Sequence, residues 1–454
     1  MEEQQTKVRG FGGRGWILII VLFLGFFMFQ TFTNYPLNIL AEDFLGGATR
    51  VAMLMTIGTF CGIAFQLIIS QFIGKIKSIK RVAMIFGIIA LICAWLVAAL
   101  PLASLGVWYV VYFIENFTVT CYALFFMSII AGQWFPTRKG TIMGISTIAY
   151  PLCNGAIGFF ATSVYKPFEQ GIFVPAIFRS FLPFLIAVTV GVILFLAFVT
   201  DYPEQCGAYR DNDRSFTPER AKQMMEEEIE NKRTTVWNIG HILRNRDFWC
   251  AAVGCGMILL AAIGAMTQSS AIIGYFPNLN YTIIMMVIAV FGAIGSFLLG
   301  FLDTHIGTKN AMLITVILMV VSGLLGWIAC RSGVGALVVV ALILLAMFMG
   351  ASSNFTVSVS VQYWRREDFQ GVFACVNPVA NVFNALAPTL TAAILYSTGG
   401  GGINVPGVFV MIAIAGVVGV ICMIIFSGKH AKKVDDKYRE AAGKPLDDAL
   451  VGRK

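Results

Sequence analysis

The stretch that decides the fold is GVFVMIAIAGVVGVICMIIF, residues 407–426. It contains no charged residue, and its apolar residues do not alternate with polar ones. A bilayer core about 30 Å thick is crossed by roughly 20 apolar residues in a helix. A membrane β-strand would instead show short segments of alternating polarity. The stretch therefore predicts a membrane-spanning helix.

Eleven further stretches of this kind occur in the 454-residue chain. The predicted spans are 15–40, 51–73, 82–101, 106–132, 141–163, 177–200, 247–273, 281–301, 310–330, 334–361, 371–397 and 404–427. The composition agrees, because 58% of the residues are hydrophobic and 12% are charged, against roughly 25% charged in a soluble protein. The predicted fold class is an all-α integral membrane protein, which excludes soluble enzymes, disordered chains and disulfide scaffolds.

Basic residues mark one side of the predicted membrane domain. Of the 32 Lys and Arg, 28 fall on the side of the termini and the central loop. The other four are Arg50, Lys166, Arg179 and Arg331. Because loops rich in Lys and Arg stay in the cytoplasm, both termini are predicted to be cytoplasmic in a multi-pass cell-membrane protein. The net charge of +8 then reflects topology, and no nucleic-acid partner is needed.

A hydrophilic segment divides the spans into six and six. The predicted parts are an N-terminal cytoplasmic tail (1–14), an N-terminal six-helix bundle (15–200), a cytoplasmic central loop (201–246), a C-terminal six-helix bundle (247–427) and a C-terminal cytoplasmic tail (428–454). Within the loop, Trp237, Ile239, Ile242 and Leu243 predict an amphipathic helix on the inner membrane surface.

Three short features recur between the halves at offsets of 226, 229 and 231 residues, close to half of 454. They are a glycine after the second and eighth spans, a Gln followed by two aromatic residues, and a glycine that opens the fifth and eleventh spans. The matched positions are Gly74 and Gly300, 133–135 and 362–364, and Gly140 and Gly371. A duplicated unit of this kind binds its substrate between the repeats, near the midplane.

The stretch QWFPTRKG, residues 133–140, followed by Gly144, resembles the loop after the fourth span in one branch of the major facilitator superfamily. That branch contains the oxalate/formate antiporters and the monocarboxylate transporters. The resemblance implies twelve helices in two pseudo-symmetric six-helix bundles, around a cavity lined by spans 1, 4, 7 and 10. It also implies conformational-switch loops, with candidate residues Gly74, Arg81, Arg138, Gly140, Asp303, Gly307, Arg365 and Gly371.

The chain departs from the family pattern in its charges. Residues 74–81 keep the cations of the loop after span 2 but lack its acid, whereas Asp303 and Gly307 keep more of the pattern after span 8. Carriers of the resembled branch place a cation in span 8 or 11, and this chain has none there. A dianionic substrate such as oxalate is therefore disfavoured.

Glu115 is the one acid that lies deep inside a predicted span, and no Lys, Arg or His lies comparably deep. A charge there costs roughly 2.5–3.5 kcal/mol on insertion scales and usually marks a functional site. Because burial favours the protonated carboxyl, Glu115 is the candidate proton-coupling residue. Trp108, Tyr112, Thr118 and Tyr122 share its helix face, which also suits a cationic or zwitterionic substrate. The alternative is a protonated Glu115 that only hydrogen-bonds a neighbouring helix.

Uncharged polar residues within the spans are the candidate substrate ligands. Asn377, Asn381 and Asn384 share one helical face, and three amides exceed what a single interhelical hydrogen bond requires. Polar residues also hold membrane helices together without any other function, and this alternative stays open for each. The candidates are Gln30, Asn34, Tyr112, Tyr122, Tyr150, Asn154, Gln268, Asn354, Asn377, Asn381 and Asn384.

The predicted function is secondary active transport. A small organic solute, with a monocarboxylate as one candidate, is predicted to cross the membrane by alternating access, coupled to protons through Glu115. The alternative is a uniporter, exchanger or efflux carrier for a neutral, cationic or zwitterionic solute. The ten Cys and three His show no metal-ligand spacing, and no glycine loop has nucleotide-binding context. We therefore expect no enzyme activity, metal or cofactor, and a monomer whose partners are the solute, protons and the lipid bilayer.

Overall fold

Helices are the regular secondary structure of the residues that the computed structural model describes. The described residues are 10–37, 45–70, 72–73, 76–99, 105–163, 175–215, 217–233, 235–365, 367–398, 402–444 and 446, and they contain no strand. Apolar stretches fold as helices in lipid because the bilayer offers no hydrogen-bond partners, so each backbone N–H and C=O must be satisfied within its own segment. The predicted all-α class is confirmed.

The N-terminal half is built from nine helical segments among the described residues. They are α1 (Gly12–Tyr35), α2 (Ala48–Ser70), α3 (Ile79–Ala99), α4 (Leu105–Val119), the π-helix η4 (Thr120–Phe126), α5 (Met127–Trp134), α6 (Lys139–Ser146), α7 (Ala149–Ser163) and α8 (Pro175–Phe198). The fourth span runs through α4, η4 and α5. The fifth is divided between α6 and α7 by a break at residues 147–148.

The C-terminal half repeats this plan. Its helices are α11 (Arg246–Thr267), α12 (Ser269–Gly274), α13 (Tyr281–Ile306), α14 (Thr308–Ser332), α15 (Gly335–Tyr363), α16 (Phe369–Leu395) and α17 (Val405–Ile425). Among the described residues, ten helical stretches are long and apolar enough to cross a membrane, and α15 makes an eleventh with two arms that meet at 46°. The remaining predicted span is the fifth, which is divided between α6 and α7.

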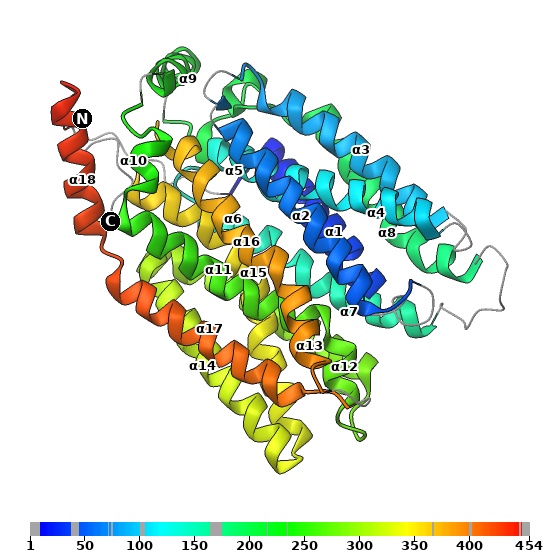
Figure 1. The fold of residues 1–454 in the computed structure, drawn as a ribbon. Coiled ribbons are helices and arrows are strands. Elements are labelled where there is room, and N and C mark those ends of the chain that lie inside the picture. The colour runs from blue at the N-terminus through cyan, green and yellow to red at the C-terminus, as the bar shows by residue number, and fades with distance from the viewer. Residues whose placement is uncertain are drawn as a thin grey trace.

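The two halves lie side by side and touch along two seams (Figure 1). One seam joins α2 to α16, and the other joins α6 and α7 to α13. The remaining segments are η5 (Pro203–Cys206), η6 (Arg210–Asn212), α9 (Pro218–Arg233), α10 (Ile239–Leu243) and α18 (Gly428–Ala441). In Figure 1, α9, α10 and α18 gather at one end of the bundle. We call this the basic end, and the opposite end the far end.

Two predictions about the basic end are wrong. Trp237 does not lie on the membrane surface, because its side chain is 2% exposed and donates to Asp435 of α18 at 2.8 Å. Gly300 does not follow the eighth span, because α13 continues to Ile306 and ends only at Gly307, whose φ of 84° favours glycine. Asp303 therefore lies inside a helix and not in a loop.

Helix α18 is held to the C-terminal half by a buried ion cluster, which we call the C-terminal cluster. It consists of Arg365, Glu367, Asp368, Asp435 and Arg439. Arg365 bonds Asp435 at 3.0 Å, while Arg439 bonds Asp368 at 2.7 Å and Glu367 at 2.8 Å. Removing one member of such a buried network leaves an uncompensated charge. The cluster thus fixes the chain end against the loop between α15 and α16.

The C-terminal cluster predicts a pH dependence of stability. Burial raises the pKa of the Asp368 carboxyl to about 6, although a hydrogen bond from Thr235 and the charge of Arg439 act in the opposite direction. A folded-state pKa above the unfolded value of about 3.9 means that the folded protein binds the proton more tightly. Protonated Asp368 therefore contributes fully to the free energy of unfolding below a pH of about 4. This contribution falls as the pH rises and is lost above a pH of about 6.

We expect the wild type to gain roughly 1 kcal/mol between pH 7 and pH 5, or about 2–4 °C in Tm, relative to Asp368→Asn. Scanning fluorimetry of both proteins at the two pH values measures this difference. The comparison cancels other titrating groups, because both proteins share them. Equal pH dependence in the two proteins would contradict the assignment to Asp368.

Glycines let the halves approach closely at the basic end. An added Cβ at Gly300 would lie 2.7 Å from the carbonyl oxygen of Gly140 and 2.8 Å from the Cα of Gly144. These are backbone atoms, so the contact is relieved only if α6 and α13 separate. Beside them, Thr141 Oγ1 and Thr304 Oγ1 lie 3.2 Å apart across the same seam.

We expect Gly300→Ala to open this seam. A cysteine pair at positions 141 and 304 should then form a disulfide roughly tenfold more slowly, since overpacking of this kind costs about 1–3 kcal/mol. Gly323→Ala is the matched control, because its Cβ would meet Ala413 within the C-terminal half at 2.6–2.8 Å. The control should lower Tm without slowing the cross-link. Slowing by both variants would mean that general destabilisation is the cause.

Candidate functional site

A small cavity lies between the halves. Its volume is about 10 Å³, which is room for about one water molecule. The lining contains hydroxyl and amide groups and no charged side chain. Its residues are Phe26 of α1, Leu124 of η4, Ser128 of α5, Leu259 of α11, Ser353 and Thr356 of α15, and Asn377 and Asn381 of α16. The lining offers hydrogen-bonding groups, and a molecule larger than water would fit only with the halves farther apart.

The three predicted asparagines of α16 form a chain of amide contacts. Asn377 donates to Gln66 Oε1 of α2 at 3.3 Å, Asn381 donates to the Asn377 carbonyl at 2.9 Å, and Asn384 donates to Asn381 Oδ1 at 3.0 Å. Two of the three line the cavity. The structure therefore brings this predicted face to the interface between the halves.

Tyr150 and Asn354 also meet at this interface. The hydroxyl of Tyr150 lies 3.2 Å from the Ser353 hydroxyl, which lines the cavity. In the amide orientation that satisfies both of its polar atoms, Asn354 donates to the Met143 carbonyl and accepts from the Gly144 N–H, each at 3.2 Å. Both contacts join the fifth span to the tenth. They place the broken helix pair α6 and α7 directly against the cavity wall.

Gln30, Asn34 and Asn154 come together at a separate place. Gln30 and Asn34 both donate to Asn154 Oδ1, the former at 3.1 Å, and Asn154 in turn approaches the Met349 sulfur at 3.5 Å. This amide group joins α1 to α7 and is not part of the cavity lining. Gln268 lies apart from it, at the break between α11 and α12, with 3% of its surface exposed.

Tyr112 and Tyr122 point into the N-terminal half and not toward the cavity. Tyr112 donates to the Phe32 carbonyl of α1 at 3.0 Å and stacks on Trp108 with ring centroids 4.7 Å apart. Tyr122 packs against Phe195 of α8, with centroids 5.5 Å apart, and against the surface of Gly87 on α3. These two side chains hold helices of one half together.

Glu115 is fully buried on the same side of α4. One carboxyl oxygen receives a 3.4 Å hydrogen bond from Asn116, and the other has no partner within the part of the chain that the structure describes. Leu124, the nearest cavity residue along the span, is nine residues away, or roughly 14 Å at 1.5 Å per residue. Glu115 is therefore a buried carboxyl group at a distance from the cavity.

The π-helix η4 begins between Glu115 and the cavity residue Leu124, and the sequence analysis did not foresee it. The N–H of Met127 bonds the carbonyl of Tyr122, five residues earlier. Such segments often occur at functional sites. Residues 106–132 read as one apolar run, so no sequence pattern signals the change. Ser128 and Thr356 were missed as well, although both are polar residues inside spans that were predicted to line the cavity.

The predicted switch residues occupy different surroundings at the basic end. Gly140 packs against Asp303, and Gly307 immediately precedes α14. The backbone N–H of the exposed Arg81 donates a hydrogen bond to the Ser78 hydroxyl. Arg365 belongs to the C-terminal cluster. A Cβ added at Gly371 would lie 3.9 Å from the carbonyl oxygen of Trp237. Gly74 lies outside the described residues. The structure therefore does not gather these residues into one site.

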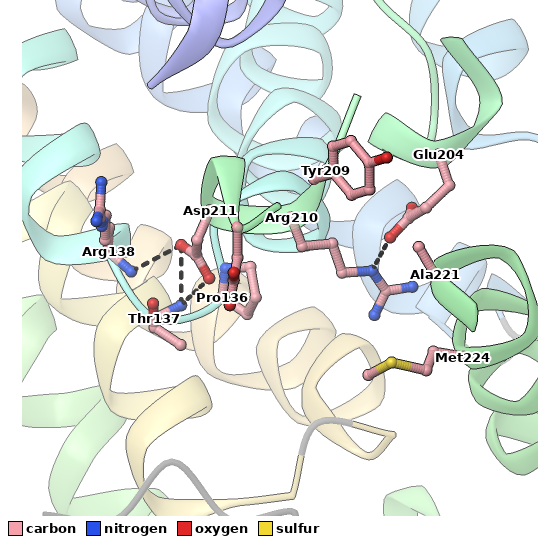
Figure 2. A pocket seen from close by; sticks show the side chains of 10 residues that line it. Pro136, Thr137, Arg138, Glu204, Tyr209, Arg210, Asp211, Ala221 and Met224 are labelled. Atoms are coloured by element: carbon pink, nitrogen blue, oxygen red, sulfur yellow. Dashed lines mark hydrogen bonds and ion pairs between the residues drawn. The ribbon is translucent and has the colours of Figure 1, made fainter. Parts of the chain in front are cut away.

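Arg138 borders a second cavity, of about 300 Å³, at the basic end. Figure 2 shows the Asp211 carboxylate facing the turn that precedes α6, while Arg210 points to Glu204. Asp211 accepts hydrogen bonds from the backbone N–H groups of Thr137 and Arg138, each at 3.1 Å. The wall of this cavity carries charges of both signs, and residues of the central loop form most of it. The hydrogen bonds to Asp211 join the central loop to the turn that precedes α6.

Comparisons with known proteins agree on the fold. A family model described as Major Facilitator Superfamily matches residues 15–302 and 258–453. A comparison with curated proteins found no match. Among solved structures, the chain is similar to the major facilitator superfamily proton:xylose symporter XylE bound to 6-bromo-6-deoxy-D-glucose. The TM-score is 0.66 at 13% identity, over 93% of this chain and 98% of that chain. At this identity the likeness concerns the fold.

Proposed function

The chain belongs to the major facilitator superfamily, whose members are transporters, and from this premise we propose that it is a proton-coupled secondary active transporter of a small organic solute. The observation that carries the proposal is the cavity between the halves, with its hydroxyl and amide lining. Such folds transport by alternating access, in which the two repeats rock about a binding site that lies between them.

The cavity lining supports a substrate recognised by hydrogen bonds. No charged side chain lies on the wall, so neither a dianion nor a dication would be balanced there. Asn381 and Ser353 can each donate and accept, which suits hydroxyl, carbonyl or single carboxylate groups. A neutral polar solute fits this lining directly. A monocarboxylate, the class that the sequence resemblance implied, fits if amides and hydroxyls suffice for its single charge.

Glu115 is proposed as the proton site. It is buried without a cationic partner in the described part of the chain, and a carboxyl group in such surroundings favours its protonated form. Since Glu115 lies away from the cavity, the proton would bind within the N-terminal half. The solute would bind at a separate site between the halves. Coupling would then pass through the fourth span, which contributes Leu124 and Ser128 to the cavity wall.

The proposed setting is the cell membrane, with the basic end in the cytoplasm and the protein as a monomer. The distribution of Lys and Arg supports this orientation. The described ends of the chain also lie there, since the Arg138 side chain donates to the Gly10 carbonyl and α18 packs on the loop before α16. The two halves, each of six spans, are proposed as the units that rock.

The alternative is a uniporter, exchanger or efflux carrier for a neutral, cationic or zwitterionic solute. Two measurements on the purified protein separate the possibilities. Binding of a panel of monocarboxylates, sugars, zwitterions and cations identifies the substrate class, and uptake into proteoliposomes with and without a proton gradient tests coupling. Accumulation that is unchanged by the gradient would favour the alternative.

A further inference from the structure

Lys139 is a buried cation at the contact between the halves, and the proposed function does not use it. It is the first residue of α6 and is 3% exposed. Its ammonium group crosses into the C-terminal half, where it donates to the Val357 carbonyl of α15 at 3.1 Å. It also lies 3.8 Å from the ring centroid of Phe369 on α16.

The surroundings of Lys139 satisfy its charge poorly. The other buried cations among the described residues, Arg365 and Arg439, are paired with carboxylates. Lys139 has no carboxylate within 4.0 Å in the described part of the chain, although Asp303 acts on it electrostatically. An ammonium group has three donors, and one hydrogen bond and one aromatic face replace its hydration here.

A series of aromatic rings lies between Lys139 and the cavity residues. Phe369 contacts Phe373 at a centroid distance of 5.8 Å, and Phe373 stacks on Phe125 of η4 at 6.1 Å. Phe125 follows the cavity residue Leu124, and Phe373 precedes Asn377 by one turn of α16. The three rings therefore lead from residues beside the cavity toward the basic end, and Lys139 covers Phe369, the last ring of this series.

The turn that leads to Lys139 is fixed to the central loop. Asp211 has a φ of 52°, which is unusual for a non-glycine residue. Its carboxylate accepts hydrogen bonds from the two backbone N–H groups before Lys139, as Figure 2 shows. The lysine therefore moves with the N-terminal half and its loop. When the halves part at the basic end, the ammonium group leaves Phe369 and Val357 and enters water.

We propose that Lys139 is a positioning residue that destabilises the closed state at the basic end, so that hydration of its ammonium group helps the halves to part there. Burying an ion costs more than imperfect partners return, and one ring face and one carbonyl are imperfect partners. The inference rests on the proposed alternating access. It predicts that a neutral side chain of similar length would keep the gate closed.

The test measures access to the cavity from the basic end. A cysteine in place of Ser128, a cavity-lining residue, is labelled in membrane vesicles by a thiol reagent that cannot cross the membrane. Peptide mass spectrometry reads that position separately from the ten native cysteines. We expect Lys139→Met to slow labelling at least about tenfold, since a charge no longer favours opening. Lys139→Arg, which keeps the charge, should stay within about twofold.

Two further readouts keep the result interpretable. Lys139→Met should raise Tm, because the closed state no longer buries a charge, whereas a merely damaged fold would lower it. Phe369→Leu removes the ring face that offsets the charge and should speed labelling about threefold or more. Equal or faster labelling in Lys139→Met overturns the proposal. The assay needs neither substrate nor a proton gradient, so it stands or falls separately from the coupling role of Glu115.

Discussion

Replacing Glu115 with glutamine is expected to abolish accumulation of the substrate against its gradient. Glutamine keeps the size and hydrogen bonding of the protonated carboxyl but cannot release a proton. With one proton per solute, a gradient of one pH unit supports about tenfold accumulation, because each 1.4 kcal/mol is a factor of ten. The wild type should therefore approach this ratio in proteoliposomes, and Glu115→Gln should stay near one.

Exchange of labelled for unlabelled substrate provides the control for Glu115→Gln. Exchange requires the cavity and the movement of the halves but no net proton transfer, so the variant should keep it. Its Tm should equal or exceed that of the wild type, since a neutral amide replaces an acid that burial penalises. Full accumulation by the variant would remove Glu115 from the coupling mechanism. Loss of both exchange and accumulation would show a structural role instead.

Replacing Asn381 with alanine is expected to weaken substrate binding by roughly 10–100-fold. The amide lies on the cavity wall, donates to the Asn377 carbonyl and accepts from Asn384. Its loss removes a ligand and also leaves the Asn384 donor without that acceptor. An unsatisfied buried group costs about 1–3 kcal/mol, which sets the size of the effect. Equilibrium binding to purified protein measures it.

Asn310→Ala is the matched control for the Asn381 variant. Asn310 is on α14, a spanning helix outside the cavity lining, and its side chain donates to the carbonyl of Ile306, the last residue of α13. The control should bind substrate like the wild type. If Asn381→Ala also binds normally while folding correctly, the substrate site is elsewhere. The amide group of Gln30, Asn34 and Asn154 would then be the next candidate.

The sequence predicted the fold well because membrane insertion imposes a simple physical rule. Spans such as 407–426 exclude charge, and the matching helix, α17, covers Val405–Ile425. The breaks within spans were not predictable in this way. Residues 147–148 and Gln268 interrupt their spans, and the polar run 267–270 around Gln268 predicts candidate polar groups as readily as a break. The π-helix in the fourth span is equally invisible, because all of its residues are apolar or weakly polar.

The candidate site was predicted in part. Helical spacing placed Asn377, Asn381 and Asn384 on one face, and that face meets the cavity. Spacing alone could not tell which side of α4 faces the other half, so Tyr112 and Tyr122 were grouped with the substrate site. Lys139 was assigned to a loop because cations usually lie there. Its burial depends on how α6 packs against α15 and α16, which a single sequence does not reveal.

The measurement that tests the central claim most directly is proton movement driven by substrate alone. Proteoliposomes with a trapped pH dye receive substrate without an imposed gradient. Wild-type protein should acidify the lumen, Asn381→Ala should require roughly 10–100-fold more substrate, and Glu115→Gln should bind substrate but produce no pH change. Uptake by the wild type without acidification, or acidification by Glu115→Gln equal to the wild type, would contradict the account.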